Sequence, residues 1–354
     1  MQVNGIDYTT IWEEGGRVEI IDQRALPFLF KTLHCERSEQ LIDAIINMAV
    51  RGAPLIGVAG AYAFAMALAE SDEDPGRIAR RISSARPTAV NLSWAVQDSL
   101  AAVERSLDRA AAAGSAWANA RKIRQEDMLR SRKIGENGFN IIKNISDQKR
   151  GTVNILTHCN AGWLAAVDYG TALAPIYVAN ERGIDLHVWV DETRPRNQGS
   201  KLTAWELDSA GIKHTIIADN VGGHLMQHGM VDVAIVGADR VAANGDAANK
   251  IGTYLKALAA KDNGVPFYVA LPGSTFDFNI EDGVRDIPIE TRDESEVKFF
   301  EGSDESGVIR RVFTCPPGSP AANYGFDVTP ARLITGFICE SGIIPPDKIQ
   351  TVKK

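Results

Sequence analysis

VNILTHCNAG (153–162) is the most informative stretch of this chain, because a short apolar run leads directly into polar and small residues. The run Val153–Leu156 has the length and the branched side chains of a buried strand. A second stretch, VDVAIVGADR (231–240), repeats this pattern. Cys159 and Asp239 follow the two expected strands, and in open parallel sheets ligands bind at the carboxyl ends of the strands. A thiol and a carboxylate at that edge indicate an enzyme.

Strand-like and helix-like segments alternate from residue 151 onward. The expected strands are Val153–Leu156, Leu186–Val190, His214–Ile217, Val231–Val236 and Phe267–Leu271, and the expected helices lie near 163–180, 201–210, 221–228 and 247–260. This alternation is typical of an α/β protein with a doubly wound parallel sheet. Residues 279–325 are charged and rich in glycine and proline, so they give no prediction of regular structure.

The first part of the chain has a different pattern. Residues 1–22 predict short strands or a hairpin, and apolar residues at helical spacing begin at Ser38. A second apolar helix is expected from Pro54 to about Ala69, and a long helical stretch from Leu92 to about Arg130. We therefore predict a mainly helical domain over residues 1–130 and the parallel-sheet domain over residues 131–354.

Composition and charge exclude several classes of protein. The 354 residues carry a net charge of −7 without a long basic cluster, which argues against nucleic acid or an anionic membrane surface as the partner. The four cysteines form no C-x-x-C pair, so neither a disulfide framework nor a zinc knuckle is expected and a reducing cytoplasm fits best. The first residues lack the pattern of a signal peptide, and no stretch approaches the roughly 18 apolar residues of a membrane span.

Two arginines stand just before expected helices. In RGAP (51–54), Arg51 and the backbone around Gly52 could hold a phosphate at a helix amino terminus, or the segment could simply start a core helix. In RPTAVNL (86–92), Arg86 either reaches a ligand at the start of the next helix or is a solvated surface residue. The residues alone leave both alternatives open.

Other candidate residues have equally plain alternatives. Gln198 lies in the loop DETRPRNQG (191–199), which either contacts a ligand or is only hydrated. Lys250 is expected near a helix start, as a phosphate ligand or as a surface lysine. Cys159 is either a buried small side chain or a reactive thiol whose pKa is lowered by a helix that starts near residues 160–162. Asp239 could also be a helix cap, and the histidines show no spacing typical of a metal site.

Six segments together resemble one known family, in the order of that family and across nearly the whole chain. The family comprises the methylthioribose-1-phosphate isomerases, the ribose-1,5-bisphosphate isomerases and the regulatory subunits of the translation-initiation guanine-nucleotide exchange factor. The segments are RGAP (51–54), RPTAVNL (86–92), THCNAG (157–162), DETRPRNQG (191–199), GADRVAANGDAANKIGTY (237–254) and FDVTP (326–330).

The resemblance implies a mainly helical amino-terminal domain, a Rossmann-like carboxyl-terminal domain and a homodimer. It assigns catalysis to Cys159 and Asp239. It places the following residues around the substrate: Arg51, Gly52, Ala53, Arg86, Gln198, Asn249 and Lys250. Trp163 departs from the pattern, because a small residue is expected after THCNAG.

The function implied is the isomerisation of 5-methylthioribose 1-phosphate, a small-molecule sugar phosphate, to 5-methylthioribulose 1-phosphate, in methionine salvage or in disposal of a related by-product. Neither a metal nor an organic cofactor is expected, since the sugar itself supplies the migrating hydrogen and its acceptor. The alternatives are an isomerase of 5-deoxyribose 1-phosphate or ribose 1,5-bisphosphate, and a non-catalytic regulatory subunit that binds sugar phosphates or nucleotides. The presence of both Cys159 and Asp239 favours an enzyme, and the lack of G-x-G-x-x-G after residue 151 argues against a nicotinamide dehydrogenase.

Overall fold

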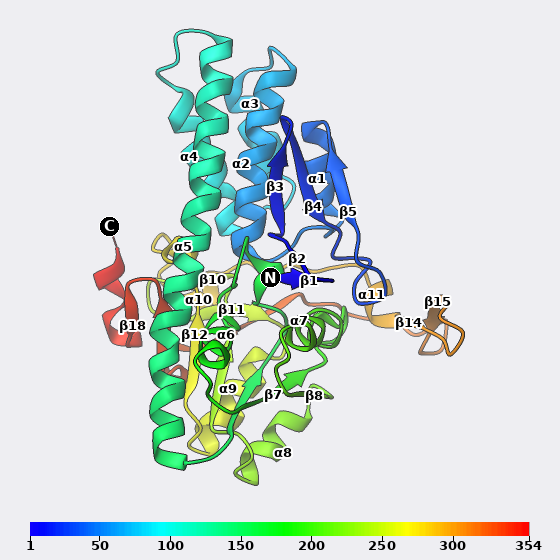
Figure 1. Cartoon of the computed structure of the whole chain (residues 1–354), viewed down its shortest axis with the longest axis vertical. Helices are drawn as coiled ribbons and strands as arrows, with labels where there is room; N and C mark the ends of the chain where they lie inside the picture. Colours follow the sequence, from blue (N-terminus) through cyan, green and yellow to red (C-terminus); the bar gives the residue numbers. More distant parts are fainter. Residues whose placement is uncertain (354) are drawn as a thin grey trace.

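A large, mainly parallel sheet forms the lower half of the molecule in the computed structural model, which describes residues 1–353 (Figure 1). Its strand order is β18-β17-β12-β9-β6-β7-β8, and only β18 runs antiparallel to its neighbour. The strands are β6 (Val153–Thr157), β7 (Leu186–Asp191), β8 (His214–Ile217), β9 (Val233–Val236), β12 (Phe267–Ala270), β17 (Gly336–Cys339) and β18 (Gly342–Ile344). All five strands that the sequence predicts are present, and the mixed α/β class is confirmed.

Helices cover both faces of this sheet. Alternate side chains of one strand enter different cores, so that Ile155 packs with α5, α6 and α7, whereas Leu156 packs with α8 and α9. The helices are α5 (Arg109–Lys149), α6 (Ala174–Glu181), α7 (Ala204–Ser209), α8 (Val221–Gln227) and α9 (Thr253–Asp262), with a π-helical turn η2 (Gly199–Thr203) before α7. β6 pairs with β7 on one side and with β9 on the other. The order in which the strands are added to the sheet therefore reverses beside β6, although the strands stay parallel.

A smaller four-stranded sheet lies beside the carboxyl ends of the large one, in the order β13-β10-β11-β16. Its strands are β13 (Phe276–Asp277), β10 (Arg240–Ala242), β11 (Ala247–Lys250) and β16 (Phe326–Thr329). The prediction that a helix begins near residue 247 was wrong, because α9 starts only at Thr253. The alanine-rich sequence favours a helix locally, but pairing with both β10 and β16 holds residues 247–250 in a strand.

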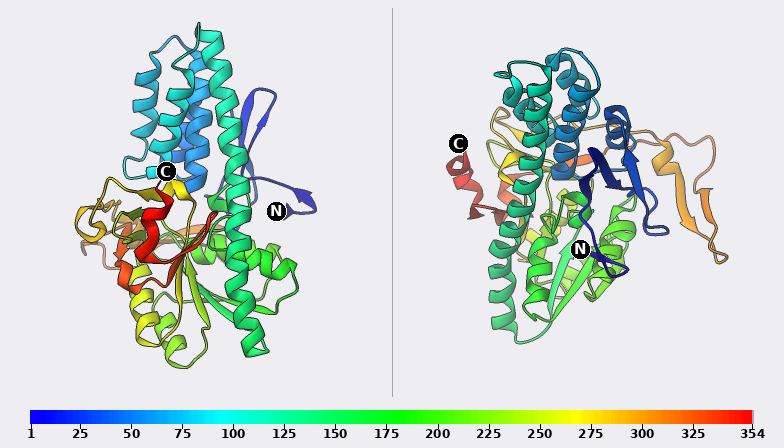
Figure 2. Two further views of the ribbon diagram at one scale, coloured as in Figure 1. Left: turned by 90° about the vertical axis from the view of Figure 1, so that its left-hand side faces the viewer. Right: turned by 45° about the horizontal axis from the view of Figure 1, so that its top comes forward.

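The upper half consists of helices α1 (Ser38–Ile46), α2 (Ala53–Glu70), α3 (Pro75–Ser83) and α4 (Val90–Val103) together with the first half of α5 (Figure 2). Beside them lie the antiparallel strands β3 (Ile11–Glu14), β4 (Arg17–Ile21) and β5 (Thr32–Cys35), and the short pair β1 (Gln2–Val3) and β2 (Ile6–Asp7). The predicted early strands and the first two helices are therefore confirmed.

Helix α2 is long and apolar enough to cross a membrane by length and composition, so the expectation that no stretch approaches such a span was wrong. Every residue from Ala53 to Leu68 is buried inside the protein. A helix that is apolar all round and enclosed by its neighbours is the central core helix of this bundle.

Helix α5 also departs from the sequence prediction. The expected helix from Leu92 to about Arg130 is divided into α4 and α5 by a turn after Val103, and α5 continues to Lys149. The predicted domain boundary at residue 130 thus falls inside a continuous helix, which runs beside both the upper bundle and the sheet (Figure 1). Gly135 and Gly138 let α5 approach α6 closely, since a Cβ atom on Gly138 would lie 2.4 Å from a side-chain carbon of Pro175.

Residues 279–325 contain short elements around an exposed hairpin. These are α10 (Gly283–Asp286), α11 (Ser295–Lys298), β14 (Phe299–Ser303) and β15 (Ile309–Phe313), and the last two pair antiparallel and project from the body of the protein (Figure 2). The remaining short helices are η1 (Trp163–Ala165), η3 (Gly273–Thr275), η4 (Ala331–Leu333) and η5 (Pro346–Val352).

Candidate active site

A cavity lies where the carboxyl ends of β6 and β9 meet the small sheet and the start of α2. All nine residues that the sequence analysis selects line it: Arg51, Gly52, Ala53, Arg86, Cys159, Gln198, Asp239, Asn249 and Lys250. The cavity holds about 60 Å³ and shares Met48, Arg51 and Gln198 with a neighbouring cavity of about 260 Å³. The structure therefore brings the predicted residues together, while their individual roles remain predictions.

Cys159 and Asp239 meet because their strands are neighbours in the sheet. β6 and β9 pair in parallel, with Leu156 opposite Ala234, so both chains leave the sheet at the same edge. The backbone N–H of Cys159 donates to Thr193 Oγ1 at 2.8 Å, and the backbone N–H of Asp239 donates to the carbonyl of Ala248 at 2.9 Å. These contacts fix both residues at the cavity wall.

The surroundings of Cys159 differ from the prediction in one important respect. No helix begins at residues 160–162; only the three-residue turn η1 follows, from Trp163. Burial raises the pKa of the Cys159 thiol, while Lys250 and Arg51 act in the opposite direction. The expectation of a pKa lowered by a helix amino terminus was therefore wrong, because no helix starts here and the one backbone hydrogen bond, from Asn160, lowers the pKa less than burial raises it.

Asp239 has the environment of a proton donor. Burial raises the pKa of its carboxyl, and the cations Lys250, Arg86 and Arg51 act against this shift. A carboxyl group in such a site keeps its proton to higher pH than an exposed one, as general acids do.

Arg51 is held rigidly in the cavity wall and is 5% exposed. Its Nε donates to Gln23 Oε1 at 2.9 Å, its Nη1 donates to the carbonyl of Asn160 at 2.9 Å, and its Nη2 donates to the side-chain oxygen of the same residue. The amide of Asn160 is oriented in turn by Glu206, which accepts from its Nδ2 at 2.8 Å. Glu206 is fully buried and also accepts from the Tyr177 hydroxyl at 2.6 Å.

Gly52 permits the turn that brings α2 to the cavity. Its φ is +91°, and a Cβ atom there would lie 2.5 Å from the Cα of Ala165. Ala53 is the first residue of α2, so the free N–H groups of the first turn lie at the cavity wall.

The remaining predicted residues approach from other segments. Arg86 Nη2 donates to Glu290 Oε2 at 2.9 Å, and the side-chain oxygen of the buried Gln198 has no hydrogen-bond partner. Lys250 ends strand β11 instead of opening a helix, and its Nζ donates to the carbonyl of Gly325 at 3.0 Å. Asn249 donates to Thr253 Oγ1 at 3.0 Å.

Sequence reasoning missed several residues of the site. Glu290 pairs with Arg86 from the charged segment to which no structure was assigned, and nothing in the sequence links the two. His158 was adjacent to a candidate residue, and its place in THCNAG was the available signal. His158, Asp191 and Asp219 offer ligand atoms within 4.8 Å of one another, but Lys256 Nζ already lies 3.2 Å from Asp191 Oδ2.

The whole chain is similar to several known proteins. The methylthioribose-1-phosphate isomerase of Rhodospirillum rubrum is 56% identical over 97% of this chain and 90% of its own length, and that of Sulfurimonas denitrificans is 58% identical over 92% and 91%. The crystal structure of 5-methylthioribose 1-phosphate isomerase from Pyrococcus horikoshii OT3 superposes with a TM-score of 0.84 at 37% identity, covering 98% of this chain and 95% of that one. The translation initiation factor eIF-2B subunit delta from A. fulgidus gives a TM-score of 0.78, also at 37% identity, with 98% and 99% covered.

The model of the initiation factor 2 subunit family matches residues 49–346. This range contains all of the cavity residues that the sequence selects. The chain therefore belongs to the initiation factor 2 subunit family, and it resembles the methylthioribose-1-phosphate isomerases over nearly its full length.

Proposed function

We propose that this protein is an aldose–ketose isomerase that converts 5-methylthioribose 1-phosphate to 5-methylthioribulose 1-phosphate. The observation that carries the proposal is the meeting of a largely enclosed carboxyl group, a thiol and three cationic side chains in one cavity. The curated relatives named methylthioribose-1-phosphate isomerase support the choice of substrate.

The chemistry requires a proton donor and acceptor. In the substrate the phosphate blocks the anomeric oxygen, so the ring cannot open to a free aldehyde. The bond between C1 and the ring oxygen must break, and a hydrogen must pass from C2 to C1. We infer that protonated Asp239 donates to the ring oxygen and that its carboxylate then accepts the proton of the C2 hydroxyl, which leaves a ketone at C2 and restores the acid.

The raised pKa of Asp239 supports this role, since the group must hold its proton near neutral pH. The raised pKa of Cys159 favours a neutral thiol over a thiolate. We infer that the hydrogen migrates directly from C2 to C1 and that Cys159 shapes the surroundings of this step. A thiolate that removes the C2 proton is the alternative.

The phosphate is expected to bind to the cations of the cavity. Arg51, Arg86 and Lys250 line the wall, and the start of α2 adds backbone N–H groups and a partial positive charge. The unpaired oxygen of Gln198 is available to a sugar hydroxyl.

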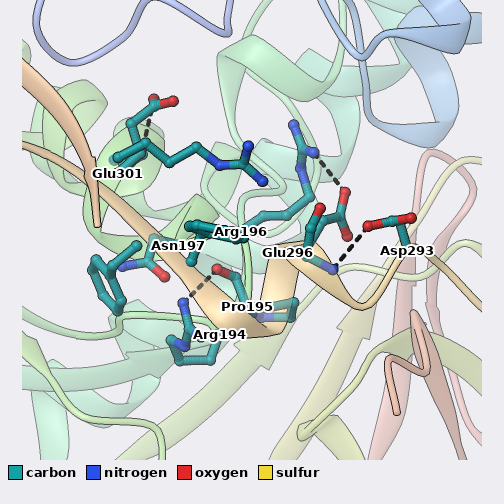
Figure 3. Close-up of a pocket in the computed structure, with 12 residues that line it drawn as sticks. Arg194, Pro195, Arg196, Asn197, Asp293, Glu296 and Glu301 are labelled. Carbon is teal, nitrogen blue, oxygen red and sulfur yellow. Dashed lines mark hydrogen bonds and ion pairs between the residues drawn. The ribbon is translucent and has the colours of Figure 1, made fainter. Parts of the chain in front are cut away.

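The neighbouring cavity bears on the 5-substituent. It presents the apolar side chains of Leu26, Met48 and Leu202. It shares Arg51 with the first cavity. Two of its other cations are already paired, Arg196 with Glu296 at 2.7 Å (Figure 3) and Lys201 with Glu301 at 3.2 Å.

Arg24 is likewise paired with Asp22 at 2.8 Å. A second phosphate would have to share Arg51 with the first one or displace a carboxylate from one of these cations, whereas a methylthio group would contact apolar atoms. We therefore favour the 5-methylthio substrate over the 5-phosphate.

An isomerisation assay with the 5-methylthio, 5-deoxy and 5-phospho forms of ribose 1-phosphate tests the proposal. We expect the highest kcat/KM with the 5-methylthio sugar and loss of turnover in Asp239→Asn. Conversion of only another sugar would reassign the substrate. Tight binding of sugar phosphate without turnover would instead indicate a regulatory subunit.

We also propose the wider features that the resemblance implies. These are a helical domain over residues 1–130, a Rossmann-like domain over residues 131–354, a homodimer and a cytoplasmic enzyme of methionine salvage. Light scattering on the purified protein tests the dimer, and growth of a deletion strain on methylthioribose as sulfur source tests the pathway.

A further inference from the structure

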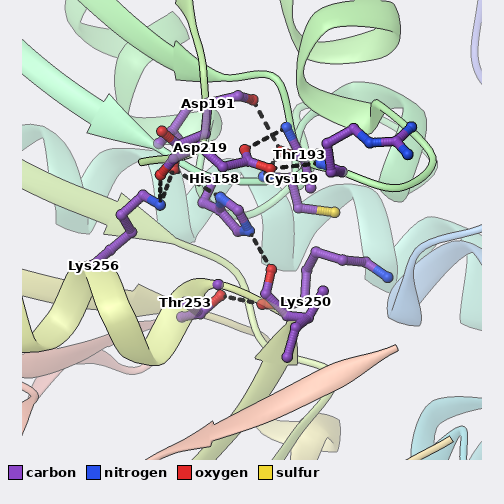
Figure 4. A network of polar contacts seen from close by, with 12 residues as sticks. His158, Cys159, Asp191, Thr193, Asp219, Lys250, Thr253 and Lys256 are labelled. Atoms are coloured by element: carbon purple, nitrogen blue, oxygen red, sulfur yellow. Dashed lines mark hydrogen bonds and ion pairs between the residues drawn. The ribbon is translucent and has the colours of Figure 1, made fainter. Parts of the chain in front are cut away.

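His158 occupies the position between the last residue of β6 and Cys159. Its side chain has no exposed surface and lies at the centre of a buried polar network (Figure 4). The proposed reaction gives this imidazole no role, although it forms part of the cavity wall.

Both ring nitrogens of His158 face hydrogen-bond acceptors. Nδ1 lies 2.8 Å from Asp191 Oδ2, and Nε2 lies 2.8 Å from the carbonyl oxygen of Ile251. A backbone carbonyl can only accept, so Nε2 must carry a hydrogen. A neutral imidazole has a single N–H, which leaves Nδ1 without a hydrogen to donate to the carboxylate.

The position of Lys256 decides where the second proton lies. Its buried ammonium is 3.2 Å from the same Oδ2 atom of Asp191 and also donates to the backbone carbonyl of Asp219. An adjacent cation stabilises the ionised form of Asp191, so the second proton belongs to the imidazole. The group then consists of two cations and the carboxylates of Asp191 and Asp219, which lie within 4.8 Å of each other and of the ring.

We propose that His158 is held as a doubly protonated imidazolium and serves as a positioning residue, which fixes Cys159 and Lys250 relative to each other. The positioning of these two residues matters for catalysis only if the proposed isomerase function is correct. The proposed protonation state of His158 rests on its hydrogen bonds and does not depend on that function.

His158 is linked to Cys159 and to Lys250 through the backbone. His158 directly precedes Cys159, and the carbonyl to which its Nε2 donates belongs to Ile251, directly after Lys250. One side chain thus joins the end of β6 in the large sheet to the end of β11 in the small sheet. Gly252 has a φ of +102°, and a Cβ atom there would lie 3.0 Å from His158 Cε1, so the turn is shaped to the ring.

The charged groups around the ring come from four segments. Asp191 ends β7, Lys256 lies on α9 and Asp327 lies on β16. Asp219 lies in the loop between β8 and α8, with a carboxylate oxygen within 4.8 Å of a ring nitrogen of His158. Asp327 accepts from the backbone N–H of Gly252 at 2.7 Å, and the positive charge of His158 acts to lower its pKa against the effect of burial. An imidazolium therefore has Asp191 as its hydrogen-bonded partner, Asp219 close by and Asp327 beside the turn at Gly252.

Nitrogen NMR on the full-length protein with ¹⁵N-labelled histidine tests the protonation state directly. We expect both nitrogens of His158 to carry hydrogens throughout pH 6–9. His228, which is exposed at the end of α8, gives a second labelled histidine signal in the same spectra and serves as the internal reference. A neutral His158 at pH 7 would overturn the proposal.

The variant His158→Asn tests the positioning role, because an asparagine amide can replace one of the two hydrogen bonds but not both. We expect kcat to fall by about 100-fold, the usual effect of a displacement of roughly 1 Å in a catalytic site. His228→Asn is the matched control and should keep the activity of the wild type.

A second readout does not need turnover. Lys250 acts to lower the pKa of Cys159. If Lys250 is no longer held in place in His158→Asn, less of the thiol is ionised at pH 8. Alkylation of Cys159 by iodoacetamide should then be slower than in the wild type by roughly threefold or more. Cys315 is the other partly exposed cysteine, so the measurement uses a Cys315→Ser background. Unchanged alkylation together with unchanged kcat would refute the positioning role.

Asp191→Asn keeps the test decisive if His158→Asn does not fold. Its amide oxygen can still accept from Nδ1, but the negative charge is gone, so His158 should become neutral within pH 6–9. A His158 that stays doubly protonated in this variant would contradict the proposal. If the wild type isomerises none of the sugar phosphates, the proposed function fails, while the NMR and alkylation results still decide the state of His158.

Discussion

The carboxylate of Glu290 lies 2.9 Å from the Nη2 atom of Arg86, although 204 positions separate the two residues in the chain. Glu290 also pairs with Arg292 at 2.7 Å. The charged segment after residue 279 is thus attached to the cavity through an arginine that we expect to bind the phosphate. A carboxylate at this point competes with the phosphate for Arg86.

Glu290→Gln should therefore lower KM for the sugar phosphate by roughly threefold to tenfold, which corresponds to about 1 kcal/mol of relieved competition. The same change removes a negative charge that acts to raise the pKa of Asp239. The pH above which activity declines should accordingly move to lower pH. Steady-state kinetics at several pH values measure both effects, with the exposed Glu305→Gln as control. A higher KM in Glu290→Gln would mean that Glu290 mainly orients Arg86.

Asp239→Asn should reduce kcat by about 10²- to 10⁴-fold, because the amide can neither donate a proton to the ring oxygen nor accept one from the C2 hydroxyl. Binding of inorganic phosphate, measured by calorimetry, should change little. In the wild type, the step that needs the protonated acid should fail as the pH rises through the raised pKa of Asp239. Turnover close to that of the wild type in Asp239→Asn would remove Asp239 from the mechanism.

A reaction carried out in deuterated water should give a product without deuterium at C1. The reason is that burial raises the pKa of Cys159, which keeps the thiolate scarce near neutral pH. A product without deuterium could also arise if Cys159 moved a proton that does not exchange with solvent. To separate this route from direct migration, the substrate labelled with deuterium at C2 is given to Cys159→Ala. We expect this variant to be slower than the wild type and still to transfer the label to C1. One solvent deuterium per turnover would instead support a thiolate base.

Gly52→Ala should destabilise the protein by about 2–4 kcal/mol, because the positive φ and the contact with Ala165 both oppose a Cβ atom. Gly114→Ala is the matched control. Gly114 is exposed on α5 with nothing within 4 Å of an added Cβ atom, and the change should stabilise the helix by about 0.5–1 kcal/mol. Urea unfolding of both variants measures the difference. Equal stabilities would show that the turn before α2 can relax.

Asp127 should make stability depend on pH away from the cavity. Burial raises the pKa of this carboxyl to about 6, above the value of 3.8 that is ordinary for an aspartate. Between these values the native state binds more protons than the unfolded state, so the free energy of unfolding decreases as the pH rises and stays lower above pH 6. Asp127→Asn should thus be more stable than the wild type at pH 8, by up to about 3 kcal/mol, and gain little near pH 4.

Urea unfolding at pH 4.5 and pH 8 checks this expectation, with the exposed Asp43→Asn as the control that should show no such dependence. A variant that is less stable than the wild type at pH 8 would show that the native state uses the ionised carboxylate of Asp127, whose Oδ2 accepts from the backbone N–H of Val167 at 2.8 Å.

The sequence was sufficient to predict the parts of the fold that are set locally or by repeated pattern. Apolar runs bounded by turns marked five of the seven strands of the large sheet, and the alternation predicted that it is parallel. Cys159 and Asp239 could be placed at one edge because both follow such runs. That β6 and β9 are direct neighbours depends on the order of strands, which short-range patterns do not encode.

The errors arose where distant contacts override local preference. Residues 247–250 prefer a helix by composition, but β10 and β16 on either side hold them as a strand that carries Lys250 to the cavity. The loop after Cys159 lacks the expected helix. The positive charges that act to lower the pKa of Cys159 come instead from Lys250 and Arg51, on other elements. The pairing of Arg86 with Glu290 could not be foreseen, because no periodicity connects residues so far apart.

The continuous helix α5 has a mechanical consequence. At 1.5 Å per residue its 41 residues extend about 60 Å, and it packs against α2 and α4 at one end and against α6 and β17 farther along. A continuous helix packed against both halves of the molecule resists hinge bending between them. A sugar phosphate larger than the 60 Å³ cavity must therefore enter by displacement of the surrounding loops, and turnover should respond to loop stiffness more than to the rigidity of the frame.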